Sequence, residues 1–187
     1  MGSRGPDIER LSLPEDASGF VRRACPVCSR PFKVRAGGAE EPILQAVFVH
    51  ALAHANAEEL SALPNRFCPY CGHQASAERF LTPAQRAYIE ARAGAIAGQV
   101  RYEQLMEVER HLDDNPYLTF IAVPPAGAVS ALPPEPDDLT AKPLLCCGGE
   151  IKLEPAWGQP FFCPHCRARH DLGLRPSRDQ ERRPSRS

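Results

Sequence analysis

Long apolar runs, aromatic residues and an excess of charge of either sign are all missing or scarce in this 187-residue sequence. No segment approaches the run of about 20 apolar residues that crosses a bilayer, and residues 1–16 lack the apolar core of a signal peptide. The net charge of −1 excludes a global attraction to nucleic acid or to an anionic membrane. Aromatic residues make up 7% of the chain, which limits the hydrophobic core that it can build. We therefore expect a cytoplasmic protein whose fold needs an additional staple.

Eight cysteines are the most informative residues present, and all of them fall in pairs. Three pairs share a gap of two residues and one pair is adjacent: Cys25-Pro-Val-Cys28, Cys68-Pro-Tyr-Cys71, Cys163-Pro-His-Cys166 and Cys146-Cys147. A two-residue gap lets one tight turn present two thiolates to the same metal ion. Because thiols stay reduced in the cytoplasm, we interpret the pairs as metal ligands and not as disulfides. The sequence therefore predicts two four-cysteine sites, each holding one Zn²⁺.

These pairs make both ends of the chain resemble the zinc ribbon or zinc knuckle superfamily, whose small β-hairpin folds grip one zinc ion between two knuckles. Gly72, directly after the second pair, matches the glycine that trails a knuckle and allows a positive φ there. The resemblance implies two sets of zinc ligands: Cys25, Cys28, Cys68 and Cys71, and Cys146, Cys147, Cys163 and Cys166. It also implies a rigid binding platform without catalytic activity.

The ligands of the second site are open to alternatives. Cys146 and Cys147 are neighbours, and neighbouring residues of a strand point to opposite faces. A turn through Gly148 and the glycine after it would bring both sulfurs to one metal ion. Otherwise His170 or, less easily, His165 replaces one of the two cysteines, or the site is degenerate and empty.

We predict an α+β protein in which two small zinc-stabilised β modules, the first with a helical insertion, are joined by a long α-helix and a proline-rich linker. Tails without an apolar period, at residues 1–19 and 175–187, are predicted to be disordered. The first module spans residues 20–81 and contains a short, half-buried strand at 30–35. Apolar residues at helical spacing place the inserted helix at about 42–60.

The segment Thr82-Pro83-Ala84-Gln85 predicts the start of the long helix. Threonine and glutamine form a capping box there, around a proline that suits the first turn. We expect this helix to span residues 82–114 and to end before Asn115-Pro116. Gly94 and Gly98 leave a flat strip on it, where either the first zinc module or a second subunit packs closely.

The remaining chain is predicted to hold the linker and the second module. Residues 115–143 combine a short strand at 117–123 with a stiff, proline-rich spacer. The second module, a zinc ribbon, covers residues 144–174. In it, an alternating strand at 150–154 pairs with Phe161-Phe162 in a hairpin that carries metal ligands at its base.

A thiol-disulfide oxidoreductase is an alternative interpretation of the same pairs. Cys-Pro-Tyr-Cys is also the active-site motif of glutaredoxins, and Cys-Pro-His-Cys is that of a periplasmic thiol oxidant. Such sites need a βαβ framework and a following helix that lowers the thiol pKa, whereas Gly72 and Arg167 follow the pairs here. His50 and His54 lie four residues apart, but no glutamate follows His50 as in zinc proteases. We therefore expect the protein not to be an enzyme.

A protein is the partner that we favour, bound through the long helix or through Trp157, which is either an exposed anchor or folds over the phenylalanines of its own hairpin. The alternative is DNA or RNA, bound through five cations around the first pair: Arg22, Arg23, Arg30, Lys33 and Arg35. Acidic stretches elsewhere would repel a polyanion. We expect a zinc-binding adaptor or regulatory scaffold, and the bias toward alanine, proline and arginine is typical of a GC-rich bacterial genome. The oligomeric state stays open.

Overall fold

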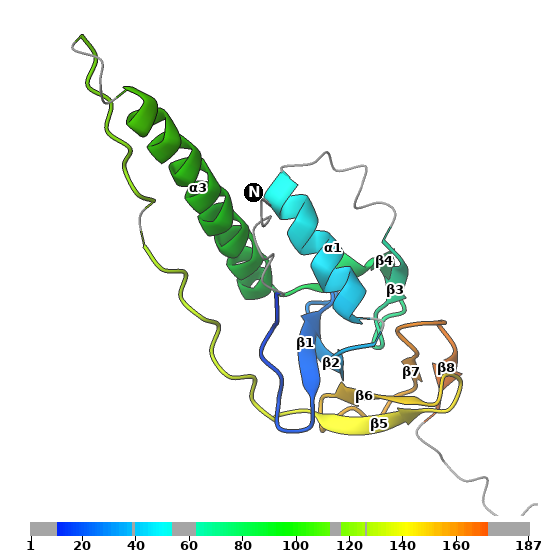
Figure 1. Ribbon diagram of the computed structural model, residues 1–187. Helices are drawn as coiled ribbons and strands as arrows, with labels where there is room; N and C mark the ends of the chain where they lie inside the picture. Colours follow the sequence, from blue (N-terminus) through cyan, green and yellow to red (C-terminus); the bar gives the residue numbers. More distant parts are fainter. Residues whose placement is uncertain (1–10, 39, 54–62, 113–116, 126, 172–187) are drawn as a thin grey trace, which may run out of the picture.

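The structure is a computed structural model that describes residues 11–38, 40–53, 63–112, 117–125 and 127–171. A four-stranded antiparallel sheet in the order β1-β2-β6-β5 forms its centre (Figure 1). The strands are β1 (Phe20–Ala24), β2 (Pro31–Arg35), β5 (Thr140–Leu144) and β6 (Gly149–Leu153). Together with the helices, these strands give the mixed α and β architecture that the sequence predicts.

Strands from the two ends of the chain meet in the middle of this sheet. β2 pairs with β6, with Lys33 opposite Lys152 and Val34 opposite Ile151. Val34 and Ile151 also belong to the same buried cluster of apolar side chains. The two cysteine-bearing halves therefore share one sheet and one core. Sequence periodicity did not predict this pairing, because it identifies a strand but not the strand's neighbour.

Two short hairpins complete the β structure. β3 (Asn65–Phe67) pairs with β4 (Gln74–Ser76), and β7 (Phe161–Phe162) pairs with β8 (Arg169–His170). The predicted hairpin between β6 and Phe161-Phe162 is therefore wrong. Residues 145–148 form a turn that folds β6 back onto β5, so β6 pairs with the strand before it. The second half accordingly begins earlier than predicted, with β5.

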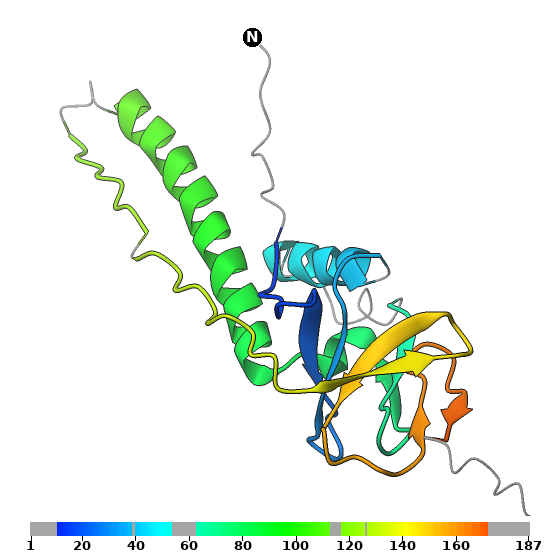
Figure 2. The same cartoon turned by 90° about the horizontal axis from the view of Figure 1, so that it is seen from below.

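Helix α1 (Glu40–Ala53) starts slightly before the predicted inserted helix, and residues 54–60 of that prediction lie outside the described residues. α1 lies beside the first turns of α3, as both ribbon views show (Figures 1 and 2). Phe48 of α1 and Ile89 of α3 are both fully buried in the shared core. A 3-10 helix, η1 (Ala77–Phe80), leads into α3. The insertion therefore adds a helical layer to the core around the sheet.

The long helix α3 (Pro83–Leu112) lies within the predicted span and starts with the predicted cap. The Thr82 amide donates to Gln85 Oε1 at 3.0 Å, and the Gln85 amide donates to Thr82 Oγ1 at 3.2 Å. Gln85 is buried, and its Nε2 donates to the carbonyl oxygen of Arg22 at 2.9 Å, which anchors the helix start on β1. Among the described helices, none is apolar over a length that would cross a membrane.

Only the first turns of α3 are buried, and the rest of the helix projects from the body (Figures 1 and 2). After the helix, the chain returns along it in an extended course, and we call residues 98–112 and 117–125 together the arm. A Cβ atom on Gly98 would lie 3.2 Å from Cβ of Pro125, whereas one on Gly94 would meet nothing within 4 Å. Gly98 of the glycine strip therefore packs against the arm's own returning segment, and the structure assigns no strand to residues 117–123, contrary to the prediction.

A buried charge cluster ties the first described residues and the end of the linker to the sheet. Asp16 binds Lys33 and Lys152, the paired lysines of β2 and β6, at 3.1 and 2.8 Å. Lys33 also binds Glu135, from the proline-rich segment, at 3.1 Å. Leu11 and Leu13 are buried in the core. The disordered tail predicted at residues 1–19 therefore does not include residues 11–19.

Candidate metal centres

The first cysteine group joins the turn after β1 to the turn between β3 and β4. Cys25 and Cys28 come from one turn and Cys68 and Cys71 from the other, and all four Sγ atoms lie within 4.8 Å of one another. The Sγ atoms of Cys25 and Cys71 are 3.8 Å apart, and those of Cys28 and Cys68 are 3.6 Å apart. Sulfurs bound tetrahedrally to one zinc ion lie about 3.8 Å apart, whereas a disulfide brings them to about 2 Å. The spacing fits a four-coordinate metal ion and excludes disulfides in this arrangement.

The second group joins the turn between β5 and β6 to the turn between β7 and β8. It consists of the four predicted cysteines, Cys146, Cys147, Cys163 and Cys166, again with all Sγ atoms within 4.8 Å. The sulfur of Cys166 lies 3.4 Å from that of Cys146 and 3.6 Å from that of Cys147, which is 3.7 Å from Cys163. Because the adjacent cysteines occupy a turn and not a strand, both of their sulfurs can face the same metal position. The glycine turn considered in the sequence is the arrangement observed, with φ of 65° at Gly148.

The histidines considered as replacement ligands lie beside this group without joining it. Nε2 of His170 is 3.2 Å from Sγ of Cys146, and its ring stacks on Phe161 at a centroid distance of 5.1 Å. His170 is therefore placed to hydrogen-bond to the Cys146 sulfur. His165 donates its backbone amide to Cys163 Sγ at 3.4 Å. Of the other histidine pair, His50 lies in α1, whereas residue 54 lies outside the described residues.

Backbone amides point at the first sulfur of each Cys-x-x-Cys turn. The amide two residues further on donates at 3.4 Å in all three turns: Val27 to Cys25, Tyr70 to Cys68 and His165 to Cys163. Burial opposes ionisation of Cys25, but backbone hydrogen bonds from Cys28 and Val27 hold the pKa of this thiol below its usual value. A backbone hydrogen bond from Ala168 lowers the pKa of Cys166 to about 7. One cysteine in each group, Cys25 and Cys166, thus favours the thiolate, the form that binds metal.

The two groups are related by an approximate two-fold axis. The amide of Phe67 donates to the carbonyl oxygen of Pro164 at 3.0 Å, and the amide of Phe162 donates to that of Pro69 at 2.9 Å. Such reciprocal contacts are the mark of two-fold symmetry. The sheet order β1-β2-β6-β5 obeys the same symmetry, because each half supplies one hairpin and the inner strands pair antiparallel. The halves are thus two copies of one structural plan within a single chain.

The knuckles at Cys68 and Cys163 match in detail. The amide of Gly72 donates to the carbonyl oxygen of Cys68 at 2.9 Å, and that of Arg167 donates to Cys163 at 3.0 Å. Gly72 has the predicted positive φ, 69°, and Arg167 has φ of 64° at the matching position. A Cβ atom on Gly72 would lie 3.2 Å from the ring of Phe162, so the knuckles also pack closely against each other. Glycine at residue 72 therefore adopts this φ without strain and leaves room for the Phe162 ring.

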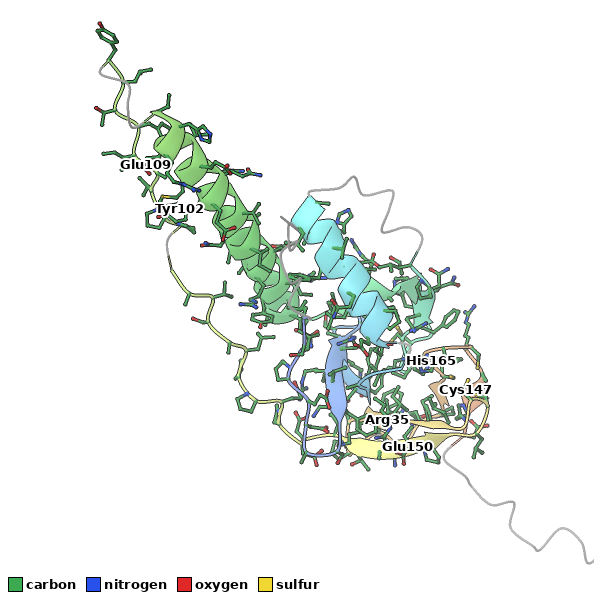
Figure 3. The ribbon with its side chains drawn as sticks, in the orientation of Figure 1. Arg35, Tyr102, Glu109, Cys147, Glu150 and His165 are labelled. Atoms are coloured by element: carbon green, nitrogen blue, oxygen red, sulfur yellow. The ribbon has the colours of Figure 1, made fainter. Side chains whose placement is uncertain are left out.

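All five cations predicted as a nucleic-acid surface have acidic partners within the chain. The pairs are Arg22–Glu135 at 2.7 Å, Arg23–Glu40 at 2.9 Å, Arg30–Glu154 at 2.8 Å, Lys33–Asp16 at 3.1 Å and Arg35–Glu150 at 2.6 Å. Lys33 is 0% exposed, because the acids around it replace solvent. Figure 3 shows Arg35 and Glu150 beside Cys147 and His165, at the end of the molecule away from the arm.

Trp157 packs on Tyr70 and Arg30 of the first half. Its ring meets Tyr70 edge-on at 4.9 Å, with the Arg30 guanidinium over it at 4.8 Å. The Tyr70 hydroxyl donates to the carbonyl oxygen of Pro31 at 2.7 Å and accepts from the amide of Glu154 at 2.9 Å. Trp157 therefore closes the junction between the two halves.

Comparison of the chain with protein-family models, with curated proteins and with solved structures finds no match.

Proposed function

We propose that this protein is a non-catalytic zinc-binding adaptor or regulatory scaffold that binds a protein partner through the arm. Each cysteine group holds one structural Zn²⁺ ion. The two ions fix the shared sheet, and the sheet and α1 hold the base of α3, from which the arm projects. The observation that carries the proposal is the row of exposed apolar side chains on the arm.

The donor sets support zinc in a structural role. Four thiolates at tetrahedral spacing suit soft or borderline metals, of which zinc is the common structural choice. Four protein ligands leave no position for a substrate or a reactive water, unlike the three-ligand sites of zinc enzymes. Structural zinc contributes on the order of 10 kcal/mol to the folding of small domains. A chain with few aromatic residues gains the staple that its core requires.

The arm carries apolar side chains that are largely exposed to solvent. Tyr117, Ile121 and Val123 are 92%, 70% and 74% exposed. Leu118 is exposed as well, at 60%, whereas Phe120 is half-buried and Ala122 is buried. The Ala122 amide donates to a carboxylate of α3 at 3.2 Å, which holds the returning segment against the helix. An extended segment with several exposed apolar side chains is suited to bind along a sheet edge or groove of another protein.

The charge distribution weighs against the nucleic-acid alternative. The five cations around the first cysteine pair form ion pairs inside the chain, so they have little charge left for phosphates. The redox alternative loses weight because the sulfurs are arranged in fours, at separations that suit a metal ion. We place the protein in a reducing, cytoplasmic compartment, since eight free thiols require one.

The test uses site-specific photocrosslinking in the native host. A photoreactive residue at Ile121 is compared with one at Val49, an exposed apolar position of α1 outside the arm. We expect a discrete adduct with one other protein at residue 121 and none at residue 49. The Ile121→Ser/Val123→Ser variant should lose this partner while keeping two zinc ions per chain. Crosslinking at both positions alike, or retention on DNA that salt disrupts, would refute the proposal, and an adduct with a second copy would identify the partner as this chain itself.

A further inference from the structure

The two-fold relation between the halves reveals one ligand that breaks it. The Ser29 amide donates to the carbonyl oxygen of Cys25 at 3.0 Å, and the Gly148 amide donates in the same way to Leu144 at 2.8 Å. Ser29 and Gly148 also share a positive φ, of 58° and 65°. Leu144 therefore occupies the place of Cys25, and Cys147 occupies the place of the second cysteine in that turn. The remaining ligand, Cys146, has no cysteine counterpart in the first group.

This displacement removes the amide support that the other turns give their first sulfur. The Gly148 amide, two residues after Cys146, donates to Leu144, and so does the amide of Cys147 at 3.2 Å. Among the described contacts, the Cys146 sulfur has the other cysteine sulfurs and His170 Nε2 as its neighbours. Amide hydrogen bonds spread the charge of a thiolate and reduce its nucleophilicity. Within the described part of the chain, Cys146 therefore lacks the backbone amide that lowers the nucleophilicity of the first sulfur in the other three turns.

The cysteines of the second group are also more exposed to solvent than those of the first group. Three cysteines of the second group are exposed: Cys146, Cys147 and Cys166. In the first group only Cys71 is exposed. The Sγ atoms of Cys146 and Cys166 are 3.4 Å apart, the shortest sulfur separation among the described contacts. Because metal binding keeps all eight sulfurs as thiolates, access decides which group an oxidant reaches first.

We propose that Cys146 is an oxidation site for hydroperoxides, and that its oxidation releases the metal ion of the second group while the first group keeps its own. The proposal depends on the metal occupancy proposed above. The Cys146 thiolate attacks the O–O bond of the hydroperoxide, which leaves a sulfenic acid and an alkoxide or hydroxide. The Cys166 thiolate then attacks this sulfur, forms the disulfide and expels hydroxide. The two thiolates lose two electrons and the hydroperoxide gains them.

The partner in the disulfide is Cys166 and not Cys147, for a geometric reason. Disulfides join residues whose Cα atoms are usually about 4.4 to 6.8 Å apart, whereas adjacent Cα atoms are held at about 3.8 Å. A disulfide between Cys146 and Cys166 removes two of the four ligands. The metal ion is then held only by Cys147 and Cys163, which is insufficient for a stable tetrahedral site.

The experiment measures metal release from the full chain loaded with two zinc ions. Hydrogen peroxide is added, released zinc is followed with a chromogenic chelator, and disulfides are mapped by mass spectrometry. We expect one zinc ion to leave at least about tenfold faster than the other, together with a Cys146–Cys166 disulfide. The matched control is Leu144→Cys/Cys146→Val, which moves the thiol into the regular Cys-x-x-Cys position. It should release both ions at the slower rate.

A second measurement needs no variant. The zinc-loaded wild-type protein is treated with limiting iodoacetamide, and Cys146 should be alkylated first. Equal release of both ions, a first disulfide within the Cys25 group, or earlier alkylation of Cys71 would overturn the assignment of Cys146. A chain that holds fewer than two zinc ions before oxidant is added would instead overturn the proposed metal occupancy.

Discussion

Asp16→Asn tests how the two halves of the chain are held together. Oδ2 of Asp16 accepts hydrogen bonds from Lys152 at 2.8 Å and from Lys33 at 3.1 Å. Its Oδ1 accepts the backbone amides of Ser18 and Phe20 at 3.0 and 3.1 Å. The carboxylate is fully buried. Asparagine keeps the shape and can still accept the two amides, but it removes the negative charge that both ammonium groups share.

The magnitude follows from these contacts. Hydrogen bonds to charged groups contribute about 1.5 to 3 kcal/mol each, so the two lysine contacts set an upper limit of about 6 kcal/mol. Lys33 keeps Glu135 at 3.1 Å and Lys152 keeps Asp137 at 2.5 Å, so neither lysine is left without an acidic partner. We therefore expect the free energy of unfolding to fall by about 3 to 4 kcal/mol. The melting temperature should fall by about 10 °C.

The same substitution should change the acid limb of the stability curve. Burial opposes ionisation of Asp16, but hydrogen bonds from Lys152, Lys33 and two backbone amides outweigh it and hold the pKa of this carboxyl below its usual value. The folded pKa is thus below the unfolded one of about 3.9. The contribution of the carboxylate is complete above that value and is lost as the pH falls through the folded pKa. The asparagine variant should lose stability less steeply in this acid range.

Urea unfolding followed by circular dichroism, at a fixed free zinc concentration, measures the loss. Asp137→Asn is the matched control, because it removes one charge from the same cluster at a side chain that is 46% exposed. It should cost about 1 kcal/mol or less. Equal losses in the two variants, or an Asp16→Asn protein within about 1 kcal/mol of wild type, would refute the role of Asp16 as a shared anchor.

Three further predictions concern the metal ligands, the junction and the arm. Cys71→Ser should leave one zinc ion per chain and unfold the first group, at a cost approaching the roughly 10 kcal/mol of structural zinc binding; unchanged metal content and melting temperature would contradict it. Burial raises the pKa of Tyr70 to about 12, so the stability of the wild-type protein should fall as the pH rises from about 10 toward 12. The Tyr70→Phe variant should lose about 1 to 3 kcal/mol of stability at neutral pH and show no such fall at high pH. Parallel pH profiles of the two proteins in urea unfolding would count against this. Gly94→Ala should stabilise α3 by about 1 kcal/mol in the same assay, and Gly98→Ala by less, because its Cβ would press on Pro125; equal gains would remove the packing argument.

Local features of this chain were readable from its residues. The Thr82 and Gln85 side chains cap α3 as expected, and the positive φ at Gly72 follows from the knuckle. The eight cysteines meet in the two predicted groups of four, because each Cys-x-x-Cys pair sits on one turn and a structural zinc ion takes four ligands. The cap and the knuckle depend on residues within a few positions of one another, where sequence patterns are most informative.

Long-range features were not readable. Lys33 and Lys152 look like solvent-facing residues of alternating strands, but they are buried because Asp16 and the acidic end of the linker cover them. The pairing of β2 with β6, and the packing of Trp157 on Tyr70, join segments more than 80 residues apart. Hydrophobic periodicity does not encode a strand's neighbour or a buried charge's partner, so these required the structure.

The position of β2 in the sheet has a consequence for synthesis of the chain. Every ligand of the first cysteine group is available once Cys71 has left the ribosome. The inner flank of β2 stays without a partner until β6 follows, and an unpaired flank of this kind invites pairing with a neighbouring nascent chain. During synthesis, the first cysteine group must therefore organise the β1-β2 hairpin before β6, the strand that later covers the inner flank of β2, has been made.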